Sequence, residues 1–191
     1  FTSEKLKELT VQKKTELSEM FSRGGKKLIG DNLQAIEKIC QAFSPKTIEK
    51  DYIENIIKKL ITFFNNSNYF QAFDESRLEA SIDNHSDNVL VIDNKVGFID
   101  ILLPQKDMRV TDSIFNMAKI SGCVAALAGK EKANLIYESC IKEGRHYEEN
   151  IRNFYEIFGC FLLSIYNDGL GRGHLSKAFS KYVEDNIGKL V

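Results

Sequence analysis

The sequence predicts a mainly helical (α+β) domain that holds one buried β-hairpin. Apolar residues recur at helical spacing before residue 66 and again after residue 112. Between these regions lie two short runs, Val89–Ile92 and Val96–Ile99, which are rich in β-branched residues and are joined by turn-forming residues. The length of 191 residues and the hydrophobic fraction of 43% suit a single domain. We divide this domain, residues 1–191, into N-terminal helices (1–79), the hairpin segment (80–110) and C-terminal helices (111–191).

Three helices are expected in the N-terminal part. The first begins at Ser3 as N-cap and ends at Gly24, and the second runs from Asp31 to Phe43. The third spans about 47–64 and carries an apolar stripe wide enough to be sandwiched between neighbours. A short helical turn over 69–75 would follow.

The hairpin and the C-terminal helices complete the expected architecture. Both faces of both strands are apolar, so we expect the ribbon to lie against the helices and to be covered on two sides. Thr111 or Asp112 would cap a helix that ends near Gly129. Further helices are expected over 131–142, 147–166 and 175–187. The glycine-rich stretch 169–173 lacks the strand-to-helix setting of a phosphate loop, which favours an interhelical turn.

Composition excludes several classes of protein. The 26 Lys and Arg residues balance 27 Asp and Glu residues, so no global charge indicates a nucleic-acid partner. The longest apolar run, 157–165, is too short to cross a membrane. The four cysteines and three histidines lie too far apart for a zinc site, and they favour reduced, buried thiols in the cytoplasm.

Polar residues gather at the open end of the ribbon, and they are the types that phosphoryl transfer requires. Asp83 and Asn88 precede the first strand, and Asp100 follows the second. In phosphoryl transfer a carboxylate orients the attacking hydroxyl, while an amide and a second carboxylate hold Mg²⁺. The register of the hairpin decides whether Asn88 and Asp100 can share an ion. With a two-residue turn, the side chain of Asn88 points away from Asp100. With a three-residue loop, the two residues lie opposite each other.

These residues also carry a resemblance to a known family. Residues 81–92 read S-I-D-N-H-S-D-N-V-L-V-I and are followed by Asp100. They resemble the H-G-D-x-H-x-x-N catalytic loop and the later metal-binding Asp of the aminoglycoside-phosphotransferase family, which shares the protein-kinase-like fold. Residues 112–118 are similar to the D-x-x-x-D-x-A helix start of that family, with Asn116 at the second Asp. The resemblance covers about 30–165 and implies the helical C-terminal (catalytic) lobe.

The resemblance implies a role for each site residue. Asp83 would be the catalytic base, and His85, which matches the second motif His, is a further catalytic candidate or a structural hydrogen-bonder. Asn88 and Asp100 would bind Mg²⁺, with ATP as the phosphate donor and a small-molecule hydroxyl as the acceptor. The motif is degenerate, since Ser81 and Ile82 replace its His and Gly.

No Gly-rich loop or strand lysine of an N-terminal nucleotide lobe precedes Asp83. ATP binding would therefore need such a lobe from a longer chain or from a protein partner.

Other interpretations of the same residues remain open. Asp, Asn and Ser are common in solvent-exposed turns, so residues 81–88 are also compatible with a surface loop that has no catalytic role. The domain is then a non-catalytic helical protein-interaction module derived from the kinase-like fold. A purely helical regulatory domain is the interpretation that remains if 89–99 is not a hairpin.

Overall fold

The computed structural model describes residues 44–71, 78–80, 88–93, 95–98, 110–142 and 148–190. This part is mostly helical, as predicted. The first two predicted helices, over 3–24 and 31–43, lie outside the described residues. The elements are α3 (Lys50–Asn66), α4 (Asn68–Gln71), β1 (Leu78–Ala80), β2 (Val89–Ile92), β3 (Lys95–Phe98), β4 (Val110–Asp112), α5 (Ser113–Ala128), α6 (Lys130–Lys142), α7 (Glu149–Gly169), α8 (Gly173–Asn186) and the 3-10 turn η3 (Ile187–Lys189).

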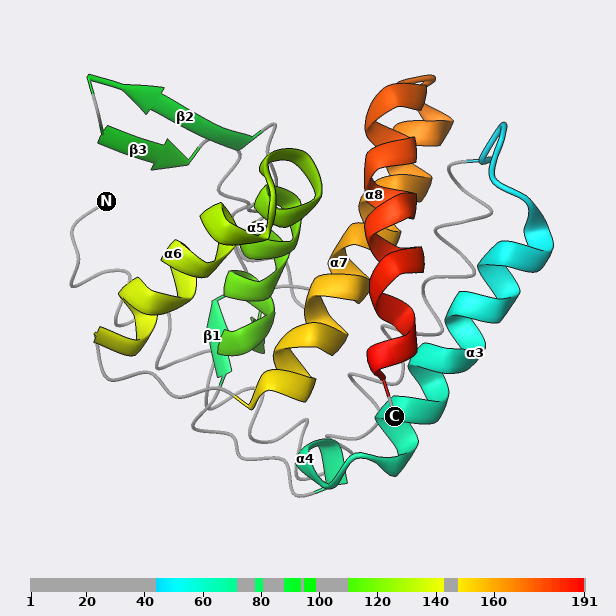
Figure 1. Cartoon of the computed structure of the whole chain (residues 1–191), viewed down its shortest axis with the longest axis horizontal. Coiled ribbons are helices and arrows are strands. Elements are labelled where there is room, and N and C mark those ends of the chain that lie inside the picture. The colour runs from blue at the N-terminus through cyan, green and yellow to red at the C-terminus, as the bar shows by residue number, and fades with distance from the viewer. Residues whose placement is uncertain are drawn as a thin grey trace.

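Helix α7 is the centre of the bundle. It packs against α5 and α8, and α3 and α6 lie on opposite sides of this group (Figure 1). Fourteen of its residues are buried, which is why its sequence has apolar side chains on more than one face. Helices α5 and α7 approach closely at Gly122, where a Cβ atom would lie 3.1 Å from the Cys160 sulfur and from the Glu156 carbonyl oxygen. A larger residue at Gly122 would push these helices apart.

Helix α3 buries the wide apolar stripe that the sequence predicted. Six of its side chains are buried: Ile53, Ile56, Ile57, Leu60, Phe63 and Phe64. The helix covers 50–66 rather than 47–64, because residues 46–48 bind the end of α7 through their backbone N–H groups instead of entering the helix. Of the short turn expected over 69–75, the structure describes a helix over 68–71.

An aromatic cluster joins α3, α4 and α7. The ring of Phe154 stacks on Phe63 with centroids 5.2 Å apart and meets Phe70 at the same distance with a steeper angle. Phe70 also meets Tyr155 edge-on at 5.8 Å. Phe70 and Phe154 are each 1% exposed, so this cluster forms the base of the hydrophobic core.

The predicted hairpin is present. Strands β2 and β3 pair antiparallel, with Ile92 opposite Lys95 and Val89 opposite Phe98. The ribbon lies at the edge of the bundle, on the side away from α3 (Figure 1). The strand side chains lie outside the described part of the chain, so the prediction that the ribbon is buried on both faces stays a prediction.

A second ladder was not predicted from the sequence. Strand β1 pairs antiparallel with β4, and Leu78 lies opposite Asp112. This pairing brings together the two ends of the 81–109 segment, which contains the hairpin and the four candidate site residues. It places both ends at the start of α5.

Candidate functional site

The start of α5 is the described part of the predicted site. Asp112 ends β4 and is the N-cap of α5, where its Oδ1 accepts a hydrogen bond of 2.9 Å from the backbone N–H of Ile114. Its Oδ2 accepts hydrogen bonds from the hydroxyls of Tyr69 at 2.6 Å and Tyr155 at 3.3 Å. Asp112 is 3% exposed. The carboxylate therefore ties β4, α4, α5 and α7 together, and it confirms the predicted cap.

Two amides of the predicted site are buried. Asn88 lies just before β2, in a 3-10 turn, and is 6% exposed, while Asn116 lies in the first turn of α5 and is 7% exposed. A buried amide needs interaction partners, and neither residue is without one. Asp83, His85 and Asp100 lie outside the described residues, so the roles assigned to them stay predictions.

The hairpin has the shorter of the two loops that the sequence left open. Ile92 pairs with Lys95, so two residues join the strands, and the first of them, Asp93, has a positive φ of 49° as a primed turn requires. Continued past Phe98, this ladder would place Asn88 opposite residue 99 rather than residue 100. Sharing of one ion by Asn88 and Asp100 therefore requires the chain to leave the ladder. Asn88 itself already does so, since it lies in a turn rather than in β2.

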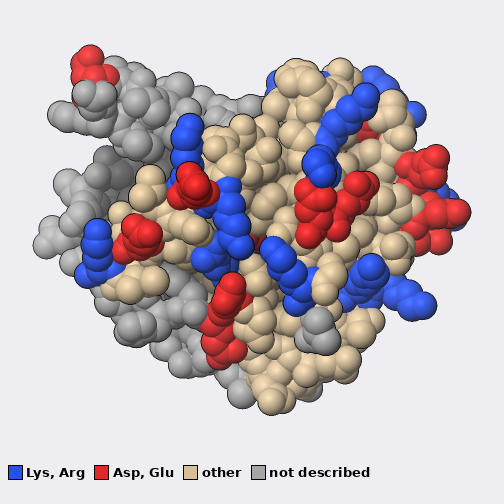
Figure 2. Space-filling model, viewed as in Figure 1, with Lys and Arg blue, Asp and Glu red and all other residues tan. Residues whose placement is uncertain are grey.

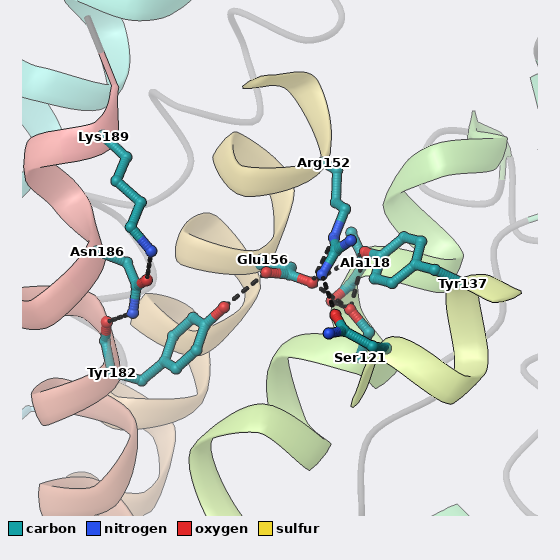
Figure 3. A network of polar contacts seen from close by, with 9 residues as sticks. Ala118, Ser121, Tyr137, Arg152, Glu156, Tyr182, Asn186 and Lys189 are labelled. Atoms are coloured by element: carbon teal, nitrogen blue, oxygen red, sulfur yellow. Dashed lines mark hydrogen bonds and ion pairs between the residues drawn. The ribbon is translucent and has the colours of Figure 1, made fainter. Parts of the chain in front are cut away.

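A second polar cluster lies inside the helical bundle and centres on Glu156 of α7. Its Oε1 accepts a hydrogen bond from Ser121, one of 2.9 Å from Tyr137, and a charged one of 3.2 Å from Arg152. Its Oε2 accepts one of 2.6 Å from Tyr182. Figure 3 shows the carboxylate between Tyr182 on one side and the other three residues on the opposite side. Glu156 is only 2% exposed, and its partners come from α5, α6, α7 and α8.

The two tyrosines of this cluster act as permanent donors. Burial, and then the charge of Glu156, raise the pKa of both Tyr137 and Tyr182 far above the ordinary value. Both hydroxyls therefore keep their protons and can donate. The guanidinium carbon of Arg152 also lies 3.5 Å from the centre of the Tyr137 ring, a cation–π contact.

The Glu156 cluster is a structural centre rather than a reactive one. The carboxylate accepts hydrogen bonds on both oxygens and is 2% exposed, so a substrate could contact it only by displacing these donors. Sequence reasoning missed this cluster because its members have no common spacing. The available signal was the i, i+4 pair of Arg152 and Glu156 within an otherwise apolar helix.

Asp168, near the end of α7, holds the segment before α3. Its Oδ2 accepts hydrogen bonds from three successive backbone N–H groups, including that of Thr47 at 2.8 Å and that of Ile48 at 3.3 Å. The Thr47 hydroxyl donates to its other oxygen. Such a row of N–H groups is a typical nest for an anion, and here the protein supplies the anion itself. The neighbouring residues 170–172 form the interhelical turn that the glycine-rich stretch predicted.

Replacing Asp168 with asparagine should destabilise the fold by about 2–3 kcal/mol near neutral pH, because hydrogen bonds to a charged group are lost. Burial alone would raise the pKa of Asp168, but the hydrogen bonds from Thr47, Ile48 and Lys46 outweigh it and lower the pKa below the ordinary value. The stabilisation by Asp168 is therefore complete above the unfolded-state pKa and is lost as the pH falls through the folded-state pKa.

Urea denaturation of wild type and Asp168→Asn from pH 7 to pH 3 tests this expectation. The difference in the free energy of unfolding should shrink towards acid pH. A difference that stays constant with pH would contradict a role for the carboxylate charge.

The other described features do not add a reactive centre. Among residues 44–71, 78–80, 88–93, 95–98, 110–142 and 148–190, no three His, Cys, Asp or Glu side chains gather in a way that would hold a metal ion. The Cys160 thiol is buried, and this burial raises its pKa. No helix within these ranges combines the length and the apolar character needed to cross a membrane.

Comparisons with known proteins assign no family to the chain. No protein-family pattern, no curated protein and no solved structure matches it.

Proposed function

We propose that the chain is a phosphotransferase-like catalytic lobe, related to kinases that phosphorylate hydroxyl groups on small molecules. Asp83 is the proposed base, with His85 beside it in the same loop, and Asn88 and Asp100 are the proposed ligands of Mg²⁺. ATP is the proposed phosphate donor, bound with the help of a nucleotide-binding lobe from the rest of the protein or from a partner.

The observation that carries this proposal is the anchoring of the 81–109 segment at α5. The β1–β4 ladder joins the two ends of the segment, and Asp112 fixes that ladder to the helix. Asn88 and Asn116 are buried polar residues at two further positions of the family-like pattern. Buried polar side chains are costly unless they are satisfied, so three of them at pattern positions favour a built site over a solvated loop.

The amide of Asn88 is a suitable ligand for a hard cation. Asn88 offers an amide oxygen, and Mg²⁺ prefers oxygen ligands. When bound, Mg²⁺ would neutralise the phosphate charge of ATP. Asp83 would orient the hydroxyl group that accepts the phosphate.

The hairpin register favours a second candidate function. A two-residue turn does not by itself bring Asn88 and Asp100 together. A non-catalytic helical protein-interaction module would have the same helical bundle and the same β1–β4 ladder. It would not require Asn88 and Asp100 to lie side by side.

Replacing Asp83 with asparagine tests the proposal in the complete native polypeptide. We expect ATP-dependent phosphorylation of a panel of small-molecule alcohols and amino sugars by wild type, and a loss of about 10²–10⁴-fold in the variant, the range of a general base. Asp87→Asn is the matched control, since it makes the same change four residues later in the sequence and should retain activity.

Equal activity of wild type and Asp83→Asn would contradict the assigned base. Absence of any phosphoryl transfer by wild type, together with an unchanged fold, would favour the interaction module.

A further inference from the structure

A groove whose lining residues are mostly of polar type lies between α3 and the start of α7. It has a volume of about 600 Å³, within the usual range for small-molecule sites. Its lining residues come from α3, α4, the start of α7 and the C-terminal end of the chain. The groove is separate from the 81–109 segment in sequence, and the inference drawn from it does not depend on the phosphotransfer proposal.

One wall of the groove is a polar stripe on α3. Asn55, Lys59, Thr62 and Asn66 follow one another at spacings of four, three and four residues, which places them on one face of the helix. The apolar stripe of the same helix faces the core, so this polar face is available to solvent. All four residues are exposed.

The groove has a fixed floor. Phe63 is buried in the aromatic cluster, and the hydroxyl of Tyr69 is held by Asp112 at 2.6 Å. The positions of both rings are therefore fixed by contacts with the protein core. A site whose floor is already ordered loses less conformational entropy when a ligand binds.

Three side-chain amides of the groove are available to a ligand. Within the part of the chain that the structure describes, the side chains of Asn55, Asn66 and Asn68 make no hydrogen bond. An amide both donates and accepts, as does a hydroxyl group, so Asn66 and Asn68, where α3 meets α4, are suited to a ligand rich in hydroxyls.

The charge of the groove favours an anion. Lys58 and Lys59 contribute two positive charges against one negative charge from Glu148, and neither lysine makes an ion pair within the described residues. Figure 2 shows basic side chains gathered over α3 near the C-terminus. Lysine binds phosphate or carboxylate groups as a mobile point charge.

We propose that this groove binds a small, hydroxyl-rich anion of the sugar phosphate class. The amides of α3 and α4 bind the hydroxyls, and Lys58 and Lys59 bind the phosphate. Because the lysines are exposed, the binding weakens as the salt concentration rises.

Isothermal titration of the whole chain with glucose 6-phosphate, glucose and inorganic phosphate tests the proposal. We expect glucose 6-phosphate to bind with a Kd of about 1 mM or tighter. Glucose lacks the phosphate group and inorganic phosphate lacks the sugar hydroxyls. Each should therefore bind at least about tenfold more weakly.

The double variant Lys58→Gln/Lys59→Gln should weaken the binding of glucose 6-phosphate by about fivefold or more, as the loss of two exposed charge contacts predicts. The double variant Lys130→Gln/Lys132→Gln is the matched control, since it removes the same charge from exposed positions on α6 and should bind as wild type does. All four positions are exposed, and circular dichroism checks that both variants fold.

Three results would overturn the proposal. They are the absence of binding by glucose 6-phosphate, equally tight binding of inorganic phosphate, and an equal loss of binding in the two double variants. Equally tight binding of inorganic phosphate would show that the groove is only a site for an ion. An equal loss in the two double variants would show only an effect of net charge.

Discussion

Replacing Glu156 with alanine should lower the free energy of unfolding by about 3–5 kcal/mol, the usual cost of breaking a buried ion pair from one side. The variant leaves Arg152 without its carboxylate and removes the acceptor that Ser121, Tyr137 and Tyr182 share. These donors come from α5, α6, α7 and α8, so the substitution removes a polar contact that these four helices share. The effect should exceed that of any single exposed ion pair.

Urea denaturation followed by circular dichroism measures this difference. Glu156→Gln preserves the shape of the side chain and should cost less, about 1–3 kcal/mol, because one acceptor becomes a donor that faces other donors. Asp185→Ala breaks an exposed i, i+4 pair with Lys181 and should change the stability by less than about 1 kcal/mol. A Glu156→Ala variant as stable as Asp185→Ala would show that the cluster does not hold the bundle together.

Replacing Phe154 with alanine should also cost about 3–5 kcal/mol, because it leaves a cavity in the aromatic cluster. The Phe154 ring contacts Phe63, Phe70, Tyr155 and Phe158, with centroids between 5.2 and 6.2 Å away. The cavity would lie where α3 and α4 meet α7. We therefore expect α3 to lose hydrogen-exchange protection before α8 does.

Thermal and urea denaturation, with hydrogen exchange resolved by peptide, test this expectation. The matched control is Leu135→Ala, which truncates a side chain that is 61% exposed and should change the stability by no more than about 0.5 kcal/mol. Equal protection of α3 in wild type and Phe154→Ala would contradict the role of the cluster.

The longer helices that the structure describes, α3 and α5 to α8, could be predicted because each has a local signal. The sequence of α5 places an Asp before an apolar run, and the structure has Asp112 as the N-cap. The interhelical turn after α7 follows from its glycines in the same way. The start of α3 could not be predicted, because it depends on Asp168, which is more than a hundred residues away in the sequence.

No pattern in the sequence predicted the pairing of β1 with β4. These strands have only three residues each and are separated by about thirty residues, so no alternation or turn motif points to their pairing. The Glu156 cluster was missed for a similar reason, since it is assembled from four helices.

Of the four predicted site residues the structure describes only Asn88, so their roles stay predictions. Asn88 and Asp112 are buried, as a built site requires, and the strands of the hairpin begin within one residue of their predicted positions. The register could not be chosen from the sequence, because Asp93, Asn94 and Lys95 permit both loop lengths. The structure has the shorter loop, and this makes the path of the chain after Phe98 decisive for the proposed metal site.

The thermal stability of the complete native polypeptide with and without Mg-ATP, in wild type and in Asp100→Asn, tests the proposed phosphotransfer site most directly. A ligand that binds only the folded state must stabilise it, so at about 100 times the Kd we expect the Tm of wild type to rise by about 5–10 °C. The rise should be absent in Asp100→Asn. An unchanged Tm in wild type, or an equal rise in both proteins, would contradict the proposal that Asp100 holds the metal.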